Sequence, residues 1–211
     1  MPEKKKGRDK KTTLAIAVSC LVLGIPVAGV AIDLESTFMP TPALRNPDVI
    51  INAPHIALFA AAFMSIISCI IVLLTTVIFR HISLNNTVVG LAGFAIAGIN
   101  LPAQLIILAL IYITNGANGA TRNPNDIRFV DGQYDTQKQF TRESFACTMD
   151  NLYLNREPWA RNACSEYHYA RYTTILMTVM ASLLLSIAYW PVRRSLGGRS
   201  SAKRVAEGSK A

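Results

Sequence analysis

Long apolar stretches alternate with polar ones along this chain. Each stretch holds about 20 consecutive, mostly apolar residues, the length that an α-helix needs to cross the ~30 Å hydrocarbon core of a bilayer. Helices of a soluble bundle would instead carry charges on their outer faces. Four segments contain no Asp, Glu, Lys or Arg: 12–32, 49–79, 81–121 and 172–192. The pattern therefore predicts four transmembrane helices: 13–32, 55–79, 88–114 and 172–192.

The charged residues lie between these segments, and their signs differ from one connection to the next. The two ends, 1–12 and 193–211, are rich in Lys and Arg, and the turn 80–87 carries Arg80 without an acidic residue. The loops 33–54 and 115–171 hold ten acidic residues against eight basic ones. Because cytoplasmic segments of membrane proteins are enriched in basic residues, we expect both termini and the turn in the cytoplasm. This topology suits the plasma membrane or the secretory pathway.

The net charge of +8 follows from this topology and does not indicate nucleic-acid binding. We expect the basic tails, 1–12 and 193–211, to attract anionic lipids by about 1 kcal/mol per basic residue near the membrane surface. Both tails have few residues that could be buried in a core, which predicts disorder there.

The first apolar segment has two interpretations, a cleaved signal peptide or a retained membrane anchor. Small residues at 27–31 resemble a cleavage site. The apolar run 14–32 is longer than the roughly 7–15 residues of a signal-peptide core, which favours the retained anchor.

The two outer loops differ in their capacity to fold. Four prolines in loop 33–54 predict an extended, irregular connection. Loop 115–171 is large enough to fold, and a helical stripe follows Asp135, which is a candidate N-cap. A second helix is expected to start near Asn155, with Pro158 in its first turn, and to run on into the fourth span. The stripe consists of Phe140, Ser144, Cys147 and Asn151.

A disulfide bond is predicted within this large loop. Cys147 and Cys164 would lie outside the cytoplasm, where disulfides persist. The bond would join the two loop helices into a small cap. The predicted fold is therefore an all-α membrane protein, a four-transmembrane-helix bundle with a small extracytoplasmic helical cap between helices 3 and 4.

Polar side chains interrupt the apolar spans at one depth. We interpret them as a helix-packing layer, because small and polar residues mark helix contacts in lipid and no span contains a charge. Asn100 is expected to donate a hydrogen bond to Ser65 or Thr178. Pro102 leaves the carbonyl of residue 98 without its helical donor, which Gln104 or water is expected to replace. The layer comprises Ser65, Asn100, Gln104 and Thr178.

A second polar cluster is expected at the outer membrane face. His55, Glu166 and His168 are candidates for acid–base catalysis or metal binding. The favoured interpretation is an interfacial belt of aromatic and polar residues, because no paired metal-ligand spacing supports the chemical one. No His-x-x-His, Cys-x-x-Cys or His-Glu-x-x-His spacing is present, and there is no phosphate-binding loop; we therefore predict no metal and no cofactor.

The arrangement of four spans, cytoplasmic termini and a larger second outer loop resembles tetraspanins in topology alone. The Cys-Cys-Gly motif of tetraspanins and the first-loop Trp and Cys pair of claudins are both missing, so no residue role is transferred. We predict a non-enzymatic protein of the lipid bilayer that organises or accompanies partners, either another membrane protein or further copies of itself. The alternatives are a small membrane enzyme with a lipophilic substrate and a transporter or channel subunit. Candidate contact residues for a partner are Phe129, Tyr153 and Trp159, and small residues on the first span (Gly24, Ala28) could dock a further helix.

Overall fold

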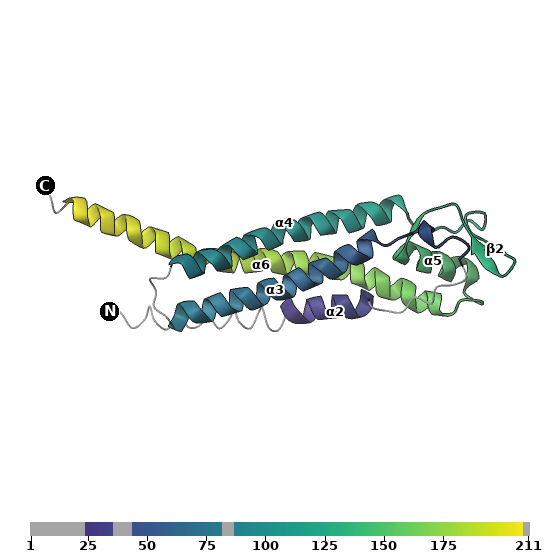
Figure 1. The fold of residues 1–211 in the computed structure, drawn as a ribbon, viewed down its shortest axis with the longest axis horizontal. Helices are drawn as coiled ribbons and strands as arrows, with labels where there is room; N and C mark the ends of the chain where they lie inside the picture. The colour runs from purple at the N-terminus through teal and green to yellow at the C-terminus, as the bar shows by residue number, and fades with distance from the viewer. Residues whose placement is uncertain (1–23, 36–43, 82–86, 209–211) are drawn as a thin grey trace. The chain divides into compact units, whose positions relative to one another are not determined.

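The computed structural model describes residues 24–35, 44–81 and 87–208 of the chain (Figure 1). It is mostly helical. The helices are α2 (Ile25–Glu35), α3 (Ala53–His81), α4 (Thr87–Ala117), α5 (Arg142–Tyr153) and α6 (Trp159–Gly208), with a 3-10 turn at Pro47–Val49. The strands are β1 (Ile50–Ile51), β2 (Arg128–Val130), β3 (Gln133–Asp135) and β4 (Phe140–Thr141).

Three of the described helices are long and apolar enough to cross a membrane. They are Ala53–Thr75 in α3, Leu91–Ala117 in α4 and Trp159–Tyr189 in α6. Large apolar side chains remain exposed on each, such as Ile56, Ile106 and Leu176, as expected of helices that face lipid rather than water. Three apolar helices of this kind indicate a membrane protein. Most of the predicted first span, 13–23, lies outside the described residues, and α2 shows only its last part.

The chain divides into two compact units. Among the described residues, the first contains those from Met64 to Ala103, from Met177 to Gly208 and from Gly24 to Pro26; the second contains those from Val27 to Phe63 and from Gln104 to Leu176. Helices α3, α4 and α6 each contribute to both units.

The core of the first unit is built from small side chains. Cys69, Val72 and Ala97 are buried there with Leu184 and Ala188. Such residues let helices approach closely in an apolar environment. Gly93 shows how closely: a Cβ atom added to it would lie 2.7 Å from Thr75 Oγ1.

The structure corrects the expectation that Gly24 and Ala28 are free to dock another helix. A Cβ atom on Gly24 would lie 2.6 Å from Cys69 Sγ, and Ala28 is fully buried. Both small residues are therefore packed against other parts of this same chain and are not exposed for a further helix.

The second unit contains a folded cap, which we define as residues 44–52 and 118–158. Its core includes Tyr134, Phe140 and Phe145, all fully or almost fully buried, with Ile127 and Met149. In Figure 1, α5 and β2 lie beyond the ends of α3 and α4.

The cap is not purely helical, which corrects the prediction. Strand β1 pairs in parallel with β4, with Ile50 opposite Phe140, and β2 pairs antiparallel with β3. Residues 44–52 of the first outer loop are therefore part of the cap rather than an irregular connection. Three of the loop's four prolines precede the strand and Pro54 follows it. The two β-branched residues Ile50 and Ile51 suit strand pairing against an aromatic core.

The starts of α5 and α6 also differ from the prediction. Thr141, not Asp135, caps α5: its hydroxyl accepts from Ser144 N at 3.2 Å, and Ser144 Oγ accepts from Thr141 N at 2.8 Å. This reciprocal pair satisfies two backbone donors at once. Helix α6 begins at Trp159, after Asn155 and Pro158.

Helix α6 continues without a break from the cap through the predicted fourth span, as expected, and then to Gly208. The backbone of residues 193–208, for which the sequence predicts disorder, continues α6 as helix. Extension of an existing helix avoids the cost of nucleation, and residues 202–207 are mostly good helix formers. The N-terminal tail, 1–12, lies outside the described residues.

Candidate functional site

The intramembrane polar layer is buried, but its hydrogen bonds differ from the prediction. Gln104 is 2% exposed and its Nε2 donates to the carbonyl of Ala61 at 2.8 Å. Asn100 is 1% exposed, and neither Oδ1 nor Nδ2 has a hydrogen-bond partner among the described residues. The expected bonds from Asn100 to Ser65 or Thr178 are therefore absent there, although both side chains are buried. An unpaired amide in this setting is destabilising.

A second polar group lies where the cap meets the helices of its own unit. The carboxylate of Glu143, in the first turn of α5, is 13% exposed. Its Oε1 lies 3.3 Å from Arg171 Nη1 and 3.1 Å from His168 Nδ1, and its Oε2 accepts from Asn115 Nδ2 at 3.0 Å. Asn115 Oδ1 in turn accepts from the hydroxyl of Thr141, the N-cap of α5. We call these five residues the junction network.

His168 gives the junction network two hydrogen-bonding states. Its Nδ1 lies 3.1 Å from Glu143 Oε1 and 3.0 Å from Arg171 Nη2. An arginine can only donate and a carboxylate can only accept, so Nδ1 binds Glu143 when it carries a hydrogen and Arg171 when it does not.

A small, partly open pocket adjoins the network, with a volume of about 30 Å³. Its lining includes His55 from α3, Ile111 from α4, and Arg142, Glu143 and Arg171. A water needs roughly 10–15 Å³ on this measure, so the pocket admits a group of a few atoms rather than a whole substrate.

The three chemical candidates from the sequence are placed differently. His55 lines the pocket, and its ring packs against the ring of Phe59 in a T-shaped arrangement, with the two ring centroids 4.9 Å apart. His168 belongs to the junction network. Glu166 does not line the pocket. The described residues hold no group of three or more metal-ligating side chains.

Sequence reasoning missed Glu143, and helical spacing explains why. His168 and Arg171 are three residues apart on α6, so they share a face, whereas Glu166 is two residues from His168 and points elsewhere. The carboxylate that balances Arg171 had to come from another element. The Thr-x-Glu-Ser sequence at 141–144 was the available signal, since it marks a helix start with an acidic first turn.

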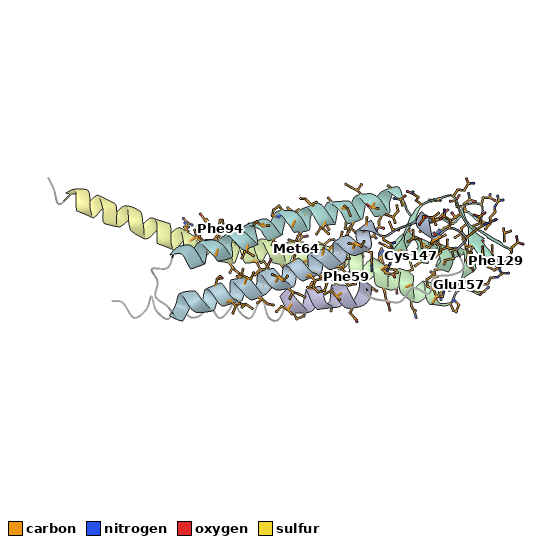
Figure 2. All side chains as sticks on the ribbon, viewed as in Figure 1. Phe59, Met64, Phe94, Phe129, Cys147 and Glu157 are labelled. Carbon is orange, nitrogen blue, oxygen red and sulfur yellow. A yellow bond between two sulfur atoms is a disulfide. The ribbon has the colours of Figure 1, made fainter. Side chains whose placement is uncertain are left out.

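The partner-contact candidates divide into one exposed residue and two anchored ones. Phe129 is 40% exposed on β2, with the guanidinium of Arg156 4.5 Å above its ring. Tyr153 donates its hydroxyl to the carbonyl of Ile127, and Trp159 donates Nε1 to Glu157; both pack against the cap core. Figure 2 shows Phe129 and Glu157 near the tip of the cap.

The β2–β3 hairpin holds Phe129 in this position. Asp131 and Gly132 both have positive φ, 51° and 80°, as a type I′ hairpin turn requires. The rings of Phe129 and Tyr134 pack in a T-shaped arrangement, with their centroids 4.9 Å apart. Tyr134 donates its hydroxyl to Glu157 Oε1 at 3.0 Å, and burial together with this bond raises its pKa to about 12.

A disulfide bond joins the cap to α6. Cys147 of α5 and Cys164 of α6 are bonded, with 17 residues of sequence separation, which confirms the predicted pair.

Comparison of the chain with protein-family models, curated proteins and solved structures found no match.

Proposed function

We propose that this chain is a four-span integral membrane protein that organises or accompanies partner proteins, with both termini in the cytoplasm and the cap as its recognition surface. Three apolar helices support the membrane placement. Helix α2 supports the first span, since it covers the last part of the apolar segment 12–32 and ends just past it, at Glu35. The basic ends support the orientation.

The cap supports a role in recognition. Connections between neighbouring helices usually need about 2–8 residues, whereas the chain inserts the whole of 118–158 between α4 and α6. This segment recruits β1 from the other loop, builds its own aromatic core and is held by a disulfide. Such construction exceeds what a connection requires.

One observation carries the proposal: the exposed Phe129 lies beneath the guanidinium of Arg156 at the tip of the cap. Aromatic and arginine side chains dominate the binding energy of protein interfaces. Val130, 45% exposed on the same strand, extends the apolar area. Within the described residues β2 pairs only with β3, so its other edge is available to an extended segment of a partner.

The test is recovery of partners from native membranes in mild detergent. A chain with Phe129→Ser and Arg156→Ala should recover its main partner at least about tenfold less well, since truncation of a central contact costs roughly 1.4 kcal/mol or more. Tyr169→Ser is the matched control, because Tyr169 is an exposed aromatic residue on α6 outside the cap.

A second control separates this function from an enzyme at the outer face. His55→Ala with His168→Ala would abolish acid–base chemistry and should leave partner recovery intact. Equal recovery by the wild type and the Phe129 and Arg156 variant would refute the recognition surface.

A further inference from the structure

The pocket beside the junction network combines apolar and cationic walls. Pro54 and Leu58 line it from the start of α3, and Ile111 from near the end of α4. Arg142 and Arg171 line it as well, against one carboxylate, Glu143. A small pocket with both characters suits a ligand that is part apolar and part anionic.

The single negative charge of Glu143 does not neutralise the positive charges of both Arg142 and Arg171. The Oε1 of this carboxylate pairs with Arg171 and its Oε2 accepts from Asn115, which leaves the charge of Arg142 unbalanced in the pocket. Among the described residues Arg142 donates a single hydrogen bond, from Nε to Asn52 Oδ1 at 3.0 Å.

Arg171 adds a second unused donor. Its Nε is buried and has no hydrogen-bond partner among the described residues, although Nη1 and Nη2 are engaged. A buried N–H without an acceptor is rare in folded proteins and destabilising. Two arginines with spare donors form the arrangement that proteins use to hold phosphate oxygens.

The level of the pocket on the helices indicates where the phosphate comes from. Pro54 and His55 lie at the start of the apolar segment of α3, and Asn115 lies near the end of that of α4. Exposed tyrosines gather at the same helix ends, namely Tyr112, Tyr169 and Tyr172. Tyrosine is enriched where a membrane meets water, which is the level of lipid headgroups.

We propose that the junction pocket binds a phosphate group, carried by the headgroup of an anionic phospholipid in the outer leaflet. The guanidinium groups of Arg142 and Arg171 hold the phosphate oxygens, and the apolar lining contacts the adjoining glycerol. This inference rests on the proposed membrane placement but not on the recognition of a partner by the cap.

The experiment uses the full chain in lipid nanodiscs that contain equal amounts of a phosphatidylglycerol and a phosphatidylcholine. Retained lipid is identified by native mass spectrometry after release. The wild type should retain the anionic lipid preferentially, and Arg142→Gln should retain about tenfold less, since a hydrogen bond to a charged group contributes roughly that factor. Arg142→Lys keeps the charge and should retain more than Arg142→Gln. Arg122→Gln, an exposed arginine away from the pocket, is the matched control.

A second arm tests soluble phosphate. Inorganic phosphate is titrated onto the wild type in nanodiscs of phosphatidylcholine alone, and the thermal unfolding midpoint is followed. Stabilisation by phosphate without retention of anionic lipid would assign the pocket to a free anion and overturn the lipid source.

Equal lipid retention by Arg142→Gln and Arg122→Gln would overturn the pocket itself. A chain that does not enter nanodiscs at all would overturn the membrane placement, and with it this proposal. The proposed recognition of a partner is tested by different variants, at Phe129 and Arg156. A failure of that test therefore leaves the result for the lipid pocket unchanged.

Discussion

The two amides of α4 should respond in opposite directions when they are made apolar. Asn100 and Gln104 are equally buried and only one turn apart. Gln104 donates to Ala61 O at 2.8 Å, whereas both polar atoms of Asn100 are unpaired among the described residues. Asn100→Leu keeps the number and branching of the heavy atoms and removes the unpaired groups. Gln104→Met keeps the length of the side chain and removes its hydrogen bond.

The expected magnitudes follow from these contacts. An unpaired buried polar group destabilises by about 1–3 kcal/mol, and the extra volume of two methyl groups offsets part of the gain. Asn100→Leu should therefore stabilise the protein by about 1 kcal/mol. Gln104→Met should destabilise it by about 0.6 kcal/mol, the average of measured intramembrane hydrogen bonds. The carbonyl of Ala61 lies inside α3 and keeps its helical donor.

The assay is reversible unfolding in mixed micelles, with Ile106→Met as a control on the exposed face of the same helix. Destabilisation of more than about 1 kcal/mol by Asn100→Leu would refute the reasoning, because it would mean that the amide has a stabilising partner. Loss of a transport activity in the same variant would favour the transporter alternative.

Three further predictions concern the cap. Cys147→Ser with Cys164→Ser should lower its free energy of unfolding by about 3 kcal/mol, because the bond closes a loop with 17 residues of separation; denaturant unfolding with and without reductant measures this. Glu143→Gln should destabilise the junction by about 3 kcal/mol, since it leaves a partly buried arginine without its counter-ion, and hydrogen exchange in α5 should rise. Tyr134 has a pKa raised from 10.0 to about 12 by burial and by its bond to Glu157. Its contribution to stability is therefore complete below pH 10 and lost as pH rises through about 12; Tyr134→Phe should show a smaller loss over that range, followed by near-UV circular dichroism.

The spans and the disulfide could be predicted from the sequence because each depends on a local or pairwise signal. The length and purity of the apolar runs predicted α3, α4 and the long α6, and two outer cysteines predicted the bond between Cys147 and Cys164.

Features that depend on contacts across the chain could not be predicted in this way. The pairing of Ile50 with Phe140 joins segments 90 residues apart, and a two-residue strand has no periodicity to detect. Depth in the membrane placed Asn100 level with Ser65 and Thr178, but depth does not determine which way a side chain points around the helix axis. Glu143 was missed because its role depends on Arg171 of another helix.

The central claim is that the tip of the cap binds a partner protein, and site-specific crosslinking in intact membranes tests it most directly. A photoreactive amino acid replaces Phe129 in one chain and Asn151, exposed on α5, in another. The account predicts one discrete crosslinked product from position 129, formed outside the cytoplasm and unaffected by His55→Ala. Crosslinking that is absent at position 129, or equal at both positions, would contradict it.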